Sequence, residues 1–96
     1  MLGGAGMARA LKDREKEIVI KEKDLVESYL GKKFTVYEPV LIKIQVANGS
    51  NFLVKILVDN EEYIHVKMNI PPLYTGLSGQ AGLIFVHTGK TFDDKL

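Results

Sequence analysis

The two histidines, His65 and His87, have the most versatile chemistry in this sequence, because imidazole both ligates metals and exchanges protons near neutral pH. A metal site needs several ligands brought close together. Neither histidine has a second histidine or a carboxylate at metal-ligand spacing, and each lies in a segment of alternating apolar residues. We therefore expect both to be ordinary strand-face residues, and we predict no metal and no cofactor.

Hydroxyl and carboxyl groups do not form a catalytic pattern either. Ser28, Ser50 and Ser78 lie outside any nucleophile-elbow motif and have no base paired with them. Glu61 and Glu62 are adjacent, so in a strand or turn their side chains point apart and cannot share a proton as an acid/base pair would. Cysteine is absent, which removes a catalytic thiol. The sequence predicts that the protein is not an enzyme.

Two glycine-containing segments could carry other functions. Gly3-Gly4-Ala5-Gly6 would cradle a phosphate only between a strand and a helix N-terminus, and no strand precedes it. Asn48-Gly49-Ser50 fits a glycosylation acceptor, but an Asn-Gly pair between alternating segments is also the strongest short hairpin signal. We interpret the first segment as a flexible arm and the second as a hairpin turn.

Composition narrows the class of protein and its partners. The 96 residues contain 13 basic and 12 acidic side chains, a net charge of +1, so charge alone attracts neither nucleic acid nor an anionic membrane. Lysines at 43, 55 and 67 interrupt the most apolar stretches, and the first twelve residues contain no apolar run typical of a secretion signal. We expect a cytoplasmic protein with one domain, residues 1–96, whose residues 1–7 form a flexible N-terminal arm.

The elements that must position any site follow from hydrophobic periodicity. Apolar residues spaced by three, four and seven predict one amphipathic helix from about Ala8 to Leu30, closed by Gly31. They are Leu11, Ile18, Val19, Leu25, Val26 and Tyr29. The charged residues between them, Glu22 included, are interpreted as a solvated face.

From Phe34 the period becomes two. The predicted strands are Phe34–Val46, Phe52–Val58, Ile64–Met68 and Leu83–Thr88, with turns at Asn48-Gly49 and Asp59-Asn60 and a loop that begins at Pro71-Pro72. Pro39 requires the first strand to lie at an edge or to contain a bulge. A helix followed by an antiparallel meander is an α+β layout, in which the sheet buries its apolar face against the helix.

Several short segments also occur in a characteristic order. They are Gly3-Gly4, Lys32-Lys33-Phe34, Gln45-Val46-Ala47-Asn48-Gly49, Asn51-Phe52-Leu53-Val54-Lys55-Ile56, Tyr63-Ile64-His65-Val66-Lys67 and Asp93-Asp94-Lys95-Leu96. In this combination the chain resembles, over nearly its whole length, the stefins, the branch of the cystatin superfamily that lacks signal peptides and disulfide bonds.

The resemblance implies a cystatin-like fold, in which one N-terminal α-helix is wrapped by a four- to five-stranded antiparallel sheet. It also implies a reversible, tight-binding inhibitor of papain-like cysteine proteases such as cathepsins. In that family the N-terminal arm and two hairpin loops enter the protease cleft as a wedge. By matching motif, the protease-binding residues here are Leu2, Gly3, Gly4, Gln45, Val46, Ala47, Asn48, Gly49, Pro72, Leu73 and Tyr74.

This sequence departs from the stefin pattern in two places. Ala47 stands where the pattern Gln-x-Val-x-Gly has valine, a change that would weaken protease contact and bring the hairpin closer to an ordinary two-residue turn. In the second loop this sequence has Ile70-Pro71-Pro72-Leu73-Tyr74, where stefins usually have a Leu-Pro or Pro-Trp pair. Counting forward from His65 and counting back from Asp94 place that pair at different positions in this sequence. An alternative remains open: a cystatin-fold interaction or scaffold module without protease inhibition. The expected state is a monomer, with a domain-swapped dimer as a side form.

Overall fold

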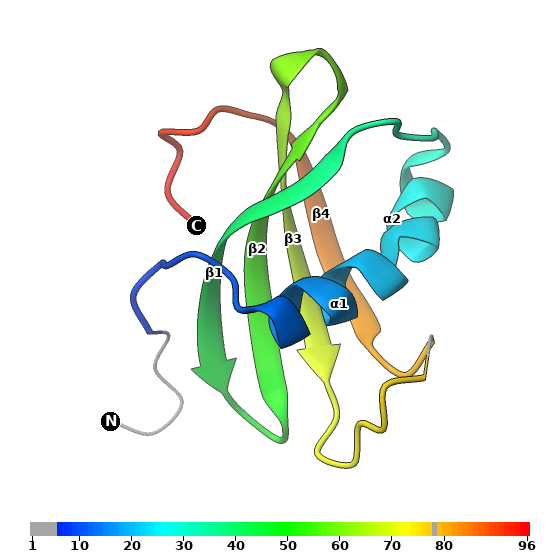
Figure 1. Ribbon diagram of the computed structural model, residues 1–96, viewed down its shortest axis with the longest axis vertical. Helices are drawn as coiled ribbons and strands as arrows, with labels where there is room; N and C mark the ends of the chain where they lie inside the picture. Colours follow the sequence, from blue (N-terminus) through cyan, green and yellow to red (C-terminus); the bar gives the residue numbers. More distant parts are fainter. Residues whose placement is uncertain (1–5, 78) are drawn as a thin grey trace.

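A computed structural model describes residues 6–77 and 79–96. In this part of the chain the elements are α1 (Asp13–Lys21), α2 (Lys23–Leu30), β1 (Tyr37–Val46), β2 (Ser50–Val58), the short 3-10 helix η1 (Asp59–Glu61), β3 (Tyr63–Ile70) and β4 (Gly82–Lys90). The strands form one antiparallel sheet in the order β1-β2-β3-β4, and the helices cover one of its faces (Figure 1). The predicted α+β, cystatin-like fold is confirmed, with its helix divided in two.

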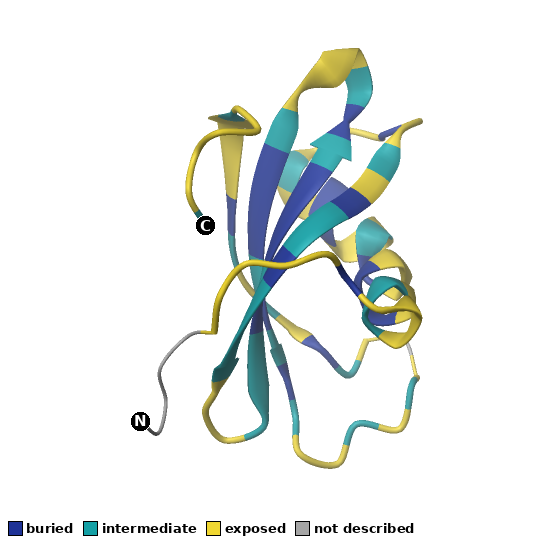
Figure 2. Cartoon of the chain, turned by 60° about the vertical axis from the view of Figure 1, so that its left-hand side comes forward, coloured by how far each residue is buried: buried dark blue, intermediate teal, exposed yellow. Residues whose placement is uncertain are grey.

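A row of aliphatic residues crosses the sheet on the face that meets the helices. It consists of Ile42, Val54, Val66 and Val86, which are register partners on successive strands. Val19 of α1 and Val26 of α2 pack on this face, and both are fully buried. Each such valine stabilises the fold by about 1.5 to 3 kcal/mol relative to an exposed position. Figure 2 shows the buried residues along the middle of the sheet and the exposed ones at its turns.

The helix is interrupted at Glu22, although the periodicity predicts a continuous helix. The backbone there has φ −98° and ψ 11°, outside the helical range. No glycine or proline lies between residues 8 and 30, so the interruption does not come from a helix-breaking residue. Glu22 itself is only 3% exposed, and its assignment to the solvated face was therefore wrong. Its spacing from Val19 and Val26 puts it on the buried stripe.

The boundaries predicted on either side of the helices also shift. The helix begins at Asp13 instead of Ala8, because the backbone at Arg9 pairs with Ile42 of β1. The first strand begins at Tyr37 instead of Phe34, because the Asp59 carboxylate accepts the backbone N–H groups of residues 35 and 36 at 3.0 and 2.6 Å. These hydrogen bonds lower the pKa of Asp59.

Pro39 was expected to lie on an edge strand or at a bulge, and the structure shows both. It lies on β1, an outer strand of the sheet, and the register with β2 shifts between Pro39 and Leu41, which marks a bulge. A proline has no N–H to donate to the sheet, so this position leaves no ladder hydrogen bond unmade.

The second half of the helix is less buried than its periodicity predicts. Leu25 and Tyr29, assigned to the apolar face, are 41% and 65% exposed. Together with Leu83 and Ile84 they line a shallow groove between α2 and β4. Among the described residues, no helix has the length and apolar character needed to cross a membrane.

Candidate functional site

The β1–β2 hairpin presents small and apolar residues at one end of the sheet. Val46 pairs with Ser50, so the connection consists of Ala47, Asn48 and Gly49. This is a three-residue loop, and the expected approach to a two-residue turn was wrong. Gly49 has φ +94°, a conformation that glycine adopts without steric cost, and the Ala47 N–H donates to its carbonyl oxygen at 3.3 Å. Val46 is 62% exposed although it ends a strand.

The β3–β4 loop, described for residues 71–77 and 79–81, reaches the same end of the sheet. The Tyr74 N–H donates to the Pro71 carbonyl oxygen at 3.2 Å, which closes a turn with Pro72 and Leu73 at its centre. Leu73 is 85% exposed. Tyr74 differs from its neighbours: it packs against the core, its hydroxyl is buried, and the Arg14 guanidinium carbon lies 5.7 Å from its ring centre. Pro72 and Leu73 are therefore the exposed residues of this turn, and Tyr74 packs between them and the core.

The two loops are in direct contact through Gly49. A Cβ atom at this position would overlap the Ile70 carbonyl oxygen and would lie 3.1 Å from the Pro71 carbonyl carbon and from Pro72 Cδ. Immediately behind this contact, Asn69 Nδ2 donates to Asn51 Oδ1 at 2.9 Å and links β3 to β2. Figure 1 shows both loops at the lower end of the sheet, side by side.

The N-terminal segment runs along the outer edge of β1 toward the same end. The Arg9 N–H donates to the Ile42 carbonyl oxygen at 3.0 Å, and the Ile42 N–H donates to the Arg9 carbonyl oxygen at 2.8 Å. The Gly6 N–H donates to the Ile44 carbonyl oxygen at 3.0 Å. The Arg9 guanidinium also forms a two-pronged bond to the Glu15 carboxylate of α1, with distances of 2.8 and 2.7 Å, which lowers the pKa of Glu15. These contacts hold residues 6 to 9 against β1 and α1. Leu2, Gly3 and Gly4 lie outside the described residues.

Contacts that hold the β3–β4 loop come from the helices. The Glu22 carboxylate accepts the Gly79 N–H at 2.7 Å, and Lys21 Nζ donates to the Gly76 carbonyl oxygen. Sequence reasoning missed these residues, because it assigned both to a solvated helix face. The available signal was an acidic residue spaced three from Val19 and four from Val26, on the apolar stripe.

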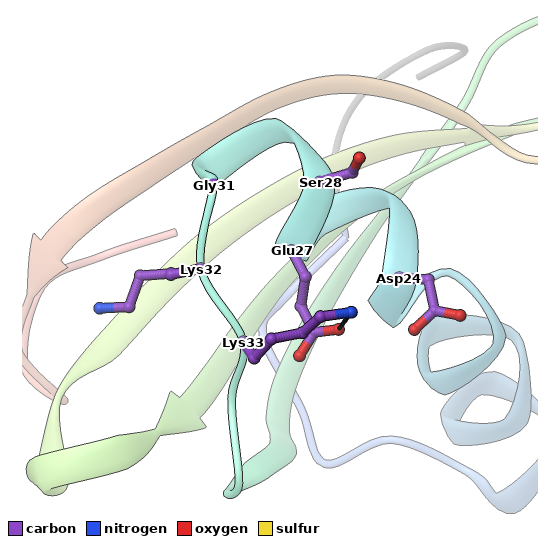
Figure 3. Close-up of a pocket in the computed structure, with 6 residues that line it drawn as sticks. All are labelled: Asp24, Glu27, Ser28, Gly31, Lys32 and Lys33. Atoms are coloured by element: carbon purple, nitrogen blue, oxygen red, sulfur yellow. Dashed lines mark ion pairs between the residues drawn. The ribbon is translucent and has the colours of Figure 1, made fainter.

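A separate hollow lies at the other end of the molecule, where α2 joins β1. Figure 3 shows the Glu27 carboxylate and the Lys33 ammonium pointing toward each other there, with 3.9 Å between Oε1 and Nζ. Glu27 is buried and also accepts the Phe34 N–H at 2.7 Å. These contacts fasten the connection between helix and sheet, and they do not reach the two loops.

The histidines face each other across β3 and β4 on the sheet surface away from the helices. His65 is buried and His87 is exposed, stacked on Phe85 with 4.1 Å between ring centres. Residues 6–77 and 79–96 contain no group of three or more histidine, cysteine, aspartate or glutamate side chains that could hold a metal ion.

Comparison with known proteins identifies the family. No family model matches the chain. Individual proteins do match. The chain is 33% identical to stefin-3 of Mus musculus, over 98% of this chain and 88% of the relative. It is 30% identical to cystatin-A2 of Dictyostelium discoideum, over 99% of this chain and 94% of the relative. It is also 28% identical, over its whole length, to a Sus scrofa protein named leukocyte cysteine proteinase inhibitor 1. The chain belongs to the stefin-type cystatin family.

Proposed function

We propose that this protein is a reversible, tight-binding inhibitor of papain-like cysteine proteases. Its wedge consists of the N-terminal arm, the β1–β2 hairpin and the turn of the β3–β4 loop. The contact residues are Leu2, Gly3 and Gly4 of the arm, Gln45 to Gly49 of the hairpin, and Pro72 and Leu73 of the loop, with Tyr74 supporting them from behind.

The observation that carries this proposal is the meeting of the two loops at Gly49. Both loops present exposed apolar side chains at one end of a sheet, Val46 at 62% and Leu73 at 85% exposure. Exposed apolar side chains on two loops that contact each other suit insertion into a protease cleft, because loops that are already ordered lose little conformational entropy on binding. Membership in the stefin family and the name of the porcine relative support the same function.

A wedge of this kind would block the cleft without being cleaved. Hydrolysis requires a scissile carbonyl about 3 to 3.5 Å from the attacking thiolate, with its oxygen in an oxyanion hole. The hairpin and the loop are turns, so neither presents an extended peptide in that position. In the arm, Gly3 and Gly4 have no side chains for specificity pockets, and glycine lets the backbone turn away from the catalytic cysteine.

Titration of papain with the full chain tests the proposal. We expect inhibition below about 1 μM, and deletion of Met1 to Gly4 should raise the inhibition constant by about tenfold or more. A Glu62→Leu variant, changed at an exposed residue in the connection between β2 and β3, should inhibit like the wild type. Absence of inhibition at tens of micromolar (about 50 μM) would favour the interaction-module alternative. Unchanged inhibition after the deletion would remove the arm from the mechanism.

Ala47 offers a separate test at the hairpin tip. Its side chain is exposed, so a larger residue meets no obstacle in the free protein. Ala47→Val adds two methyl groups at the proposed contact, worth about 1 to 2 kcal/mol if they are buried in the complex. We expect an inhibition constant lower by about fivefold or more, and equal affinity would show that this position is not buried by the protease.

The proposed working state is a cytoplasmic monomer. The cysteine-free sequence suits a reducing compartment. A domain-swapped dimer would arise by exchange of elements about the β1–β2 hairpin, and gel filtration after heating would detect it. A single monomer peak throughout would exclude that side form.

A further inference from the structure

The kink between α1 and α2 coincides with a contact to the β3–β4 loop. Glu22 has φ −98° and ψ 11°, in a sparsely populated region of the backbone map. Its N–H donates to the Val19 carbonyl oxygen at 3.2 Å, a tighter pattern than that of an α-helix. No glycine or proline accounts for the kink.

The Glu22 side chain makes a tertiary contact at the kink. Its carboxylate is buried and points at the loop, where Oε1 accepts the Gly79 N–H at 2.7 Å and Oε2 lies 3.4 Å from the same nitrogen. A buried carboxylate is costly unless it is hydrogen-bonded, and a charged acceptor makes a stronger bond than a neutral one. The irregular backbone and the buried carboxylate thus occur together at the position from which this side chain reaches the loop.

Neighbouring contacts fasten the same stretch of the loop. Lys21 Nζ donates to the Gly76 carbonyl oxygen, and Arg14 lies over the Tyr74 ring. Within the loop, Gln80 Oε1 accepts the N–H groups of Thr75 and Leu77, both at 3.0 Å. The far side of the loop is thus held by helix side chains, and the turn with Leu73 is left exposed.

We propose that Glu22 is a positioning residue for the β3–β4 loop: by holding Gly79 against the helix junction, it keeps Pro72 and Leu73 beside the β1–β2 hairpin in the geometry that enters a protease. This inference rests on the proposed inhibitory function. Glu22, which is buried, is assigned no direct contact with the protease. Glu22 acts on the complex only by positioning the loop, and we expect it to change mainly the rate at which the complex dissociates.

The test compares two substitutions at Glu22 by inhibition of papain and by hydrogen exchange at the Gly79 amide. Glu22→Leu removes the acceptor, and Glu22→Gln keeps an amide oxygen that can accept the same N–H. We expect Glu22→Leu to speed Gly79 exchange and to raise the inhibition constant by about tenfold, mainly through faster dissociation. Glu22→Gln should stay within about threefold of the wild type.

Glu62→Leu is the matched control, since it makes the same change at an exposed glutamate. If Glu22→Leu does not fold, Lys21→Met provides a second variant, which removes the contact to the Gly76 carbonyl oxygen. It should raise the inhibition constant by less than the effect expected of Glu22→Leu. Wild-type inhibition retained in Glu22→Leu, with or without faster Gly79 exchange, would overturn the positioning role. A wild-type protein that does not inhibit papain would instead refute the proposed function, while the exchange measurement would still test the Gly79 contact.

Discussion

Gly49→Ala tests whether the contact between the two loops is as tight as the structure makes it. Gly49 has φ +94°, and the added methyl group would overlap the Ile70 carbonyl oxygen. That oxygen belongs to the backbone of β3, so it cannot rotate away as a side chain would. A left-handed backbone costs alanine about 1 to 2 kcal/mol, and overpacking costs about 1 to 3 more. We expect the free energy of unfolding to fall by about 2 to 5 kcal/mol.

Urea unfolding followed by far-ultraviolet circular dichroism measures this loss. For a domain of this size it corresponds to a fall in melting temperature of roughly 10 to 30 °C. Gly89→Ala is the control, because Gly89 also has a positive φ, +69°, but no atom lies within 4 Å of its added Cβ. The control isolates the backbone cost. If the two variants lose the same stability, within about 0.5 kcal/mol, the loops are not in tight contact and the argument for a preformed wedge fails.

The remaining predictions concern the core and the outer face of the sheet. Ile56→Ala, at a fully buried site, should destabilise by about 2 to 5 kcal/mol in the same urea assay, and a loss under 1 would contradict the packing. Lys55 Nζ donates to the carbonyl oxygens of Phe92 and Asp94, so Lys55→Met should release residues 91–96, seen as faster amide exchange there. Burial lowers the pKa of His65, helped by Lys55, Lys90 and His87 and opposed by Asp94. The unfolded chain therefore takes up a proton more readily, and stability should fall as the pH drops from about 7 to 5. His65→Gln should make stability depend less on pH in this range. An unchanged pH profile would show that His65 does not cause the loss of stability.

Local patterns predicted much of the fold. The change from helical to strand period located every strand of the described sheet to within a few residues, because side-chain alternation is set by the backbone itself. Asn48-Gly49 located the hairpin for a similar reason, since glycine tolerates the positive φ that the turn requires. The boundaries failed where side chains from distant segments intervened, as Asp59 does before β1.

The candidate site was predicted less completely. The sequence nominated Val46 and Leu73, and both are highly exposed at the expected end of the sheet. It nominated Tyr74 as their neighbour in the second loop, and this residue is partly buried and packs against the core. Glu22 was missed because a charged residue in a helix is normally solvated, although its spacing from Val19 and Val26 puts it on the buried stripe. The hydrogen bond from the Gly79 N–H to its carboxylate is visible only in the tertiary structure.

The sequence by itself determined the class of fold, the place of the hairpin, the absence of a cysteine and the similarity to stefins. Those properties depend on residue type and on neighbours along the chain. Only the tertiary structure decided that Gly49 lies against Ile70 and that the helix bends at Glu22. Both depend on how segments far apart in the sequence pack together, and periodicity carries no information about that packing.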